Sequence, residues 1–157
     1  MRMELKSNDF QNKEKLDKKF SGQAEAFSPH LKWDDPPEET KSFALTCIDP
    51  DTEVGSWSLW NVCDIDKDVR EIPQNGPIPG KVIENDYREL GYTGPCPKEG
   101  EHEFHFIIYA LDIPELENVN QKNFRKIVHQ HMIEKATIIG LYEQEIDFRE
   151  FRRMSCH

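Results

Sequence analysis

The sequence has no long apolar run. None of its 157 residues lies in a stretch that approaches the roughly 20 apolar residues of a membrane-spanning helix. The N-terminal segment MRMELKSNDFQNKEKLDKKF lacks the apolar core of a secretory signal peptide. These absences predict a protein without stable membrane insertion and with a cytoplasmic location.

Positive charge is scarce relative to negative charge. The chain has 20 Lys and Arg against 30 Asp and Glu, which gives a formal net charge of -10 at pH 7. Such a surface repels nucleic-acid phosphates and acidic membranes, so we do not expect nucleic acid as a partner. The nine Phe, three Trp and four Tyr supply aromatic anchors that a disordered acidic chain lacks. We therefore expect one folded domain.

Cysteine is sparse and forms no metal or redox motif. Cys47, Cys63, Cys96 and Cys156 are scattered, with no CxxC pair to indicate zinc or a thioredoxin-like centre. Two disulfides remain arithmetically allowed. Cys47 and Cys63 lie inside apolar segments, which favours small core residues in a reducing compartment.

Other metal-binding patterns are missing as well. His102 and His105 lie on an expected strand, where their odd separation directs the two rings to opposite faces. The acidic clusters do not follow the EF-hand loop with its glycine and final glutamate. The sequence therefore predicts no metal site and no cofactor.

Three segments have the composition of strands. Residues 42–49, 57–65 and 103–111 are rich in apolar, β-branched and aromatic residues, and the turn sequence DPD at 49–51 ends the first. Regular alternation along the second strand places two sets of side chains on opposite faces. One face has Trp57, Leu59, Asn61 and Cys63, and the other has Ser58, Trp60 and Val62. Prolines and glycines between residues 66 and 82 predict a long ordered loop.

The C-terminal third indicates a helix followed by a strand. A helix is expected from Asn123, because Phe124, Ile127, Val128 and Met132 have helical spacing and Asn is a favoured N-cap residue. The segment ATIIGLYE then predicts a final strand to about residue 143. We expect residues 1–143 to form the domain and residues 144–157 to form a C-terminal tail or a short helix.

Three motifs together resemble a known family. They are SPHLKW at 28–33, DPD at 49–51 followed by WSLW at 57–60, and GPCP at 94–97 followed by His102. Their order and spacing are similar to those of the phosphatidylethanolamine-binding protein family, which includes Raf kinase inhibitor protein. Asn85-Asp86, Tyr92 and the ending IIGLY resemble its bacterial branch. The resemblance implies a β-sandwich with a few peripheral helices and a small anion pocket at one end.

The resemblance also implies which residues line that pocket. Matched by motif position, they are Asp49, Trp57, Leu59, Gly94, Pro95, His102 and Phe104. Leu59 stands where the family motif W-x-H-W has its histidine. The family's H-R-Y resembles His102-Glu103-Phe104, which removes a hydroxyl and exchanges a cation for an anion. The resemblance therefore implies a degenerate anion pocket.

Strand geometry adds two predictions about this pocket. Residues two apart share a face of a strand, so Leu59 should face the pocket with Trp57, and Phe104 with His102. Asp49 and His102 should lie within direct or water-bridged reach, because the resemblance matches both to pocket positions and rigid Pro-containing turns bring both to strand ends.

The implied function is binding of a small anion or phosphorylated ligand, with modulation of a protein partner and no catalysis. Inhibition of a kinase or protease and formation of a homodimer are further implications of the resemblance. The alternative is a small hydrolase that uses Cys96, or an acid, with His102. An enzyme of this kind needs a nucleophile, a base and an oxyanion site converging at separations of about 3 Å.

Overall fold

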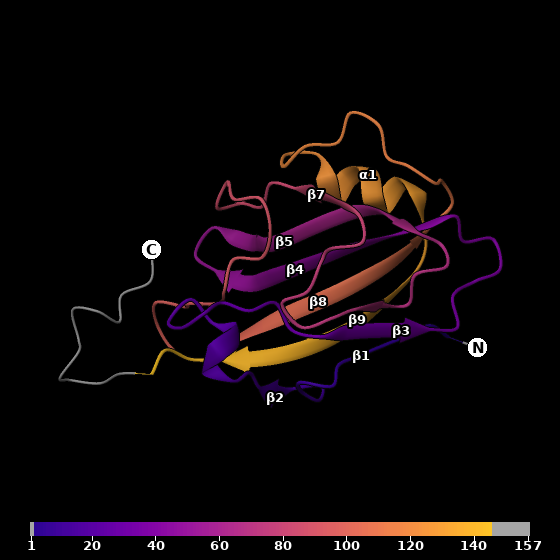
Figure 1. Ribbon diagram of the computed structural model, residues 1–157. Coiled ribbons are helices and arrows are strands. Elements are labelled where there is room, and N and C mark those ends of the chain that lie inside the picture. The colour runs from indigo at the N-terminus through magenta and orange to yellow at the C-terminus, as the bar shows by residue number, and fades with distance from the viewer. Residues whose placement is uncertain (1, 146–157) are drawn as a thin grey trace.

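The computed structural model describes residues 2–145 and shows a mainly β domain with two sheets (Figure 1). Its elements are β1 (Glu4–Lys6), β2 (Glu14–Lys15), a 3-10 turn (Lys18–Phe20), β3 (Leu31–Asp34), β4 (Ser42–Thr52), β5 (Gly55–Asp66), β6 (Glu71–Ile72), β7 (Lys81–Ile83), β8 (His102–Leu111), α1 (Phe124–His131) and β9 (Met132–Tyr142). The larger sheet has the strand order β2-β9-β8-β4-β5-β7, and the smaller one has the order β1-β3-β6. The mainly β fold predicted from the sequence is confirmed.

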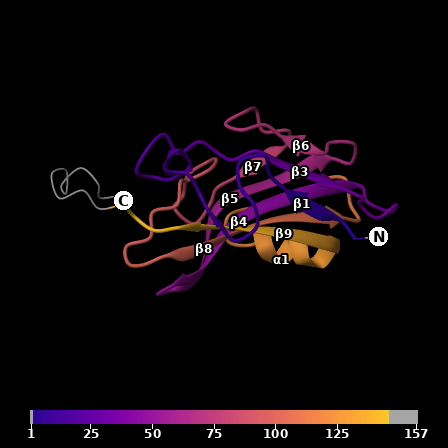
Figure 2. The same ribbon diagram turned by 90° about the horizontal axis from the view of Figure 1, so that it is seen from below.

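The larger sheet is covered on both faces. Figure 2 shows the smaller sheet on one side of it and α1 on the other. One apolar cluster, which includes Phe43 and Phe106, lies on the side of the smaller sheet. A second cluster, which includes Ala44 and Tyr109, packs against α1. Because successive residues of a strand point to opposite faces, β4 is buried on both sides, as its apolar sequence predicts.

A β-bulge in β5 overturns one prediction about side-chain direction. Trp60 lies opposite Cys47, while Ser58 lies opposite the next residue of β4, Ile48, so that Leu59 is an extra residue in β5. Leu59 and Trp60 consequently both join the core cluster on the side of the smaller sheet. The prediction that Leu59 and Trp60 occupy opposite faces was wrong, because alternation holds only where the pairing is regular.

The C-terminal third of the domain follows the prediction except at Met132, which was expected on the helix but begins β9, because it pairs with Leu111 of β8. Asn123 is the N-cap residue of α1, although its side chain makes no capping hydrogen bond, and β9 ends at Tyr142. Most of the segment expected to be a tail or short helix, residues 146–157, lies outside the described residues. Within residues 2–145, no helix is long and apolar enough to cross a membrane.

The N-terminal segment is held by the last strand. β2 pairs with β9 in parallel, with Glu14 opposite Gly140, and the backbone N–H of Lys13 donates to the carbonyl of Ile139 at 2.6 Å. A Cβ atom at position 140 would lie 2.6 Å from Cδ2 of Leu16. A larger residue at position 140 would therefore displace the buried Leu16 side chain that packs against β9.

Candidate functional site

Two neighbouring strands bring Asp49 and His102 together. Asp49 lies near the end of β4 and His102 begins the antiparallel β8, at the end of the sheet that carries the β4–β5 hairpin (Figure 1). Nδ1 of His102 is 2.6 Å from Oδ2 of Asp49. The side chain of Asp49 is 7% exposed and that of His102 is 19% exposed. The predicted contact between these two residues is confirmed.

Hydrogen bonds orient this pair. Because a carboxylate only accepts, Nδ1 of His102 carries a hydrogen and donates it to Asp49. The other oxygen of Asp49 accepts the backbone N–H of Asp51 at 2.9 Å. Among the described residues, none hydrogen bonds to Nε2 of His102. This nitrogen accepts a hydrogen bond from a ligand when the ring is neutral and donates one when the ring is protonated.

Two apolar residues, Leu59 and Phe104, stand at the positions where the family motifs have hydrogen-bonding side chains. The rings of His102 and Phe104 are stacked, with centroids 6.4 Å apart. Leu59 and Phe104 lie in the core cluster on the side of the smaller sheet, and each is 1% exposed. Neither side chain offers a hydrogen-bond donor. Both of these positions are therefore occupied by buried apolar side chains.

The segment that contains Gly94 and Pro95 packs against the end of the large sheet. The backbone N–H of Thr93 donates to the carbonyl of Leu59, and that of Gly22 donates to the carbonyl of Pro95. A Cβ atom at position 94 would lie 2.5 Å from the backbone N of Gly22. Position 94 therefore needs glycine so that the 93–97 segment can approach the chain at residue 22.

Tyr87 is a site residue that the sequence analysis missed. Its ring meets that of Trp57 edge to face, with centroids 5.8 Å apart. Burial and the nearby charges of Asp49, Asp86 and Glu89 raise the pKa of the Tyr87 hydroxyl. The hydroxyl therefore stays protonated at neutral pH and can donate a hydrogen bond near Asp49. The Asn85-Asp86 dipeptide beside it was noted only as part of the family resemblance.

Asn85 holds the loop that carries Tyr87. The Asn85 side chain is fully buried and makes five hydrogen bonds. Its amide nitrogen donates to the carbonyls of Leu59 and Gly91 and to the hydroxyl of Thr93, and its oxygen accepts the backbone N–H groups of Tyr87 and Glu89. Asn85 thus ties the 85–93 loop to the bulge of β5.

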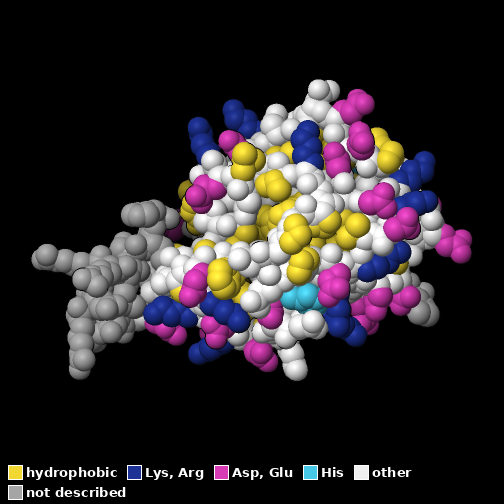
Figure 3. All heavy atoms as spheres, in the orientation of Figure 1, with side chains coloured by type: hydrophobic (Ala, Val, Ile, Leu, Met, Phe, Trp, Pro, Cys, Tyr) yellow, Lys and Arg dark blue, Asp and Glu magenta, His cyan; other side chains and the backbone are white. Residues whose placement is uncertain are grey.

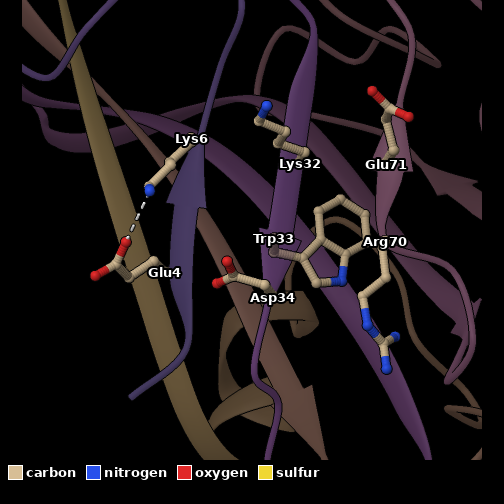
Figure 4. Close-up of a pocket in the computed structure, with 7 residues that line it drawn as sticks. All are labelled: Glu4, Lys6, Lys32, Trp33, Asp34, Arg70 and Glu71. Carbon is tan, nitrogen blue, oxygen red and sulfur yellow. Dashed lines mark ion pairs between the residues drawn. The ribbon is translucent and has the colours of Figure 1, made fainter. Parts of the chain in front are cut away.

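A separate hollow lies on the outer face of the smaller sheet. It has a volume of about 510 Å³, and Figure 4 shows the residues that line it: Glu4, Lys6, Lys32, Trp33, Asp34, Arg70 and Glu71. None of the predicted pocket residues is among them. Its charged side chains have both signs, and Lys6 pairs with Glu4 on the same strand at 3.2 Å. This hollow is therefore distinct from the site at Asp49 and His102.

Two cysteines lie in the core, as the sequence predicts. Cys47 and Cys63 are buried and free, which confirms that they are core residues. Burial raises the pKa of Cys63 to about 12 and also raises that of Cys47. Cys96 is disulfide-bonded.

Within residues 2–145, no group of three or more His, Cys, Asp or Glu residues is placed to hold a metal ion.

Comparison with known protein families and sequences gives a consistent result. A sequence model of the family described as phosphatidylethanolamine-binding protein matches residues 6–143. The UPF0098 protein YbhB of Escherichia coli is 35% identical, over 89% of this chain and 99% of that protein. A UPF0098 protein of Methanothermobacter thermautotrophicus is 34% identical, over 90% of this chain and 99% of the relative.

Two solved structures have the same fold. A phosphatidylethanolamine-binding protein homologue from Chlamydia trachomatis matches with a TM-score of 0.84 and 32% identity, covering 92% of this chain and 99% of the other. Escherichia coli YbcL, described as a member of the mammalian family of such proteins, matches with a TM-score of 0.85 and 25% identity, covering 92% and 100%. Both likenesses therefore extend over almost the whole chain.

Proposed function

Because this chain belongs to the phosphatidylethanolamine-binding protein family, we propose that it binds a small anionic or phosphorylated ligand beside Asp49 and His102. The observation that carries the proposal is the hydrogen bond between these two residues at the end of the large sheet. Asp49 holds the ring through Nδ1, so that a protonated His102 directs its Nε2–H toward a ligand. Tyr87 contributes a second donor from the neighbouring loop.

The residues at positions 59 and 104 support weak binding of a free anion. Leu59 and Phe104 replace two hydrogen-bonding side chains of the family motif and are buried in the core. A hydrogen bond to a charged group contributes about 1.5 to 3 kcal/mol and a neutral one about 1, so the loss of both weakens anion binding by roughly ten- to a thousandfold. We expect inorganic phosphate to bind in the millimolar range or more weakly.

A phosphorylated group on a protein partner fits the site better than a free anion. Exposed apolar side chains on the β4–β5 turn and on the loop that carries Tyr87 can supply the additional contacts. Val54 on the β4–β5 turn and Leu90 on the 84–91 loop are each 74% exposed, and Tyr87 is 41% exposed. We propose that the chain modulates such a partner. A homodimer and a cytoplasmic location stay predictions from the sequence.

The absence of catalysis is part of the same proposal. The disulfide of Cys96 supports it, because a disulfide-bonded sulfur is not available as a thiolate nucleophile. Asp49 accepts hydrogen bonds from His102 and from the backbone of Asp51, which suits a positioning role for its carboxylate. A screen of ester, phosphate and peptide substrates should stay at background. Reproducible turnover that is lost in Cys96→Ala or His102→Ala would refute this part of the proposal.

An NMR titration with inorganic phosphate and with acetate tests the binding site. We expect saturable shifts of the His102 ring and of the Trp57 and Tyr87 signals. These shifts should be larger when the His102 ring is protonated, because Nε2 then donates a hydrogen bond to the anion. Replacing His102→Ala should weaken phosphate binding about tenfold or more, because one charge-assisted hydrogen bond is lost.

His105→Ala is the matched control. His105 lies on the same strand as His102 but on its opposite face, and its ring is 3.1 Å from the carboxylate of Glu103. Its replacement should leave phosphate binding unchanged. Equal losses in the two variants would mean that general charge attraction, and not the His102 site, binds the anion. Micromolar affinity for phosphate, measured from the His102, Trp57 and Tyr87 signals, would contradict the proposed degenerate pocket.

A further inference from the structure

A small hollow lies beside β5, on the face of the large sheet against which α1 packs. It has a volume of about 110 Å³ and is lined by Ser58, Asn61, Asp86, Gln121, Lys122, Phe124 and Arg125. The bulge at Leu59 separates it from the site described above, because Leu59 joins the core on the other side of the sheet while Ser58 lines this hollow.

The wall of the hollow contains a buried polar network. Ser58 is 3% exposed and Asn61 is 2% exposed. Asn61 accepts the hydroxyl of Thr46 at 2.8 Å and donates to the Ser58 hydroxyl and to the carbonyl of Glu84, each at 3.2 Å. The Ser58 oxygen also accepts the backbone N–H of Asp86 at 3.0 Å. The hydroxyl hydrogen of Ser58 has no acceptor among the described residues, so a buried donor remains available at the hollow.

The one carboxylate in the lining is already occupied. Asp86 accepts the backbone N–H of Ser58 at 2.7 Å through one oxygen and the side-chain amide of Gln121 at 2.5 Å through the other. The lining also contains two cations, Lys122 and Arg125. The described contact of the Arg125 guanidinium with an oxygen is a long one, 3.4 Å to the carbonyl of Ser56. The lining therefore has an excess of positive charge and of hydrogen-bond donors.

We propose that this hollow binds a small oxyanion, either free phosphate or the phosphoryl group of a larger molecule. Lys122 and Arg125 neutralise the charge, and the Ser58 hydroxyl donates to one oxygen. Phe124, the first residue of α1, also lines the hollow, so the partial positive charge of the helix start adds to theirs. At roughly 30 Å³ for each water molecule, the volume corresponds to three or four waters, which is enough for an oxyanion.

An NMR titration of the full-length chain with inorganic phosphate tests this inference, with chloride at equal ionic strength as the reference. We expect saturable shifts of the backbone amides of Ser58 and of residues 121–125. Arg125→Gln should weaken this binding about tenfold or more. The matched control is Lys126→Gln, which removes the next cation of α1 from outside the lining and should change the affinity less than about twofold.

The outcomes separate this hollow from the site at His102. In His102→Ala, the shifts at Ser58 and at residues 121–125 should persist with unchanged affinity. Shifts confined to the surroundings of His102 would overturn this inference and leave the proposed function intact. A linear response up to the highest phosphate concentration would mean an adventitious ion only. Equal losses in Arg125→Gln and Lys126→Gln would also overturn the inference, since long-range attraction alone would then explain the binding. A titration with phosphorylated small molecules then distinguishes free phosphate from a phosphoryl group as the better ligand.

Discussion

Removal of the Asn85 side chain should destabilise the protein more than any exposed asparagine substitution. Asn85→Ala deletes five hydrogen bonds from a fully buried side chain. At a net contribution of about 1 kcal/mol each, they set an upper limit of about 5 kcal/mol. Groups of the loop near the surface regain hydrogen bonds with water. We therefore expect a loss of about 3 kcal/mol in the free energy of unfolding.

Urea and thermal unfolding, followed by circular dichroism, measure this effect. A loss of about 3 kcal/mol corresponds to a decrease in Tm of about 6 to 12 °C for a chain of this size. Asn12→Ala is the control, because exposed Asn12 accepts a single hydrogen bond, from the backbone N–H of Ile139. It should cost less than about 1 kcal/mol. The signals of Tyr87 and Trp57 should shift in Asn85→Ala and stay in place in Asn12→Ala.

Asn85→Asp separates the two halves of the Asn85 network. An aspartate keeps an acceptor for the N–H groups of Tyr87 and Glu89 but places an acceptor against the carbonyls of Leu59 and Gly91. Burial and these carbonyls should raise the pKa of the new carboxyl above its value in the unfolded chain. The stability of the variant should therefore be greatest at low pH and should fall as the pH rises through the raised pKa. A loss under 1 kcal/mol in Asn85→Ala, or a pH-independent deficit in Asn85→Asp, would refute the assigned role.

Three further predictions concern Leu59 and Phe104, the glycine of the site and the core thiols. The double variant Leu59→His, Phe104→Tyr should bind phosphate about tenfold more tightly or better in calorimetry, most clearly below neutral pH. A folded double variant without any gain in affinity would contradict the pocket assignment. Gly94→Ala should lower the free energy of unfolding in urea by about 1 to 3 kcal/mol, because its Cβ would lie 2.5 Å from backbone atoms. The amide hydrogen of residue 22, which donates to Pro95, should exchange faster. An unchanged urea midpoint would contradict this prediction. Cys47 and Cys63 should resist maleimide at pH 8 until the protein unfolds, because burial raises the pKa of both thiols. Rapid labelling of the native protein would show that the core opens.

The long strands and the Asp49–His102 contact were predictable from the sequence. β4 and β8 are each long enough for composition and turn residues to identify them, and the motif positions placed Asp49 and His102 at adjacent strand ends. The short strands were not predicted. β2 and β6 contain two residues each and exist only because β9 and β3 supply their hydrogen-bond partners. Local composition has no information about partners so distant in the chain.

The direction of Leu59 and the role of Tyr87 show a different limit. A period of two predicts side-chain direction only along a regular strand, and a single inserted residue in β5 reversed the relation of Leu59 to Trp60. Tyr87 reaches Trp57 because Asn85 folds the intervening loop back onto β5. No periodicity marks such a loop residue. That the predicted residues bind a ligand stays a prediction.

The pairing of the N-terminal segment with the last strand has a consequence for synthesis on the ribosome. Met3 hydrogen bonds to Glu134, which lies 131 residues later in the chain. At about 5 to 20 residues per second, the ribosome needs roughly 7 to 26 s to add those residues. During this time Leu16 lacks the backbone of Gly140, against which it packs in the native fold. The fold should therefore close only after β9 has left the exit tunnel.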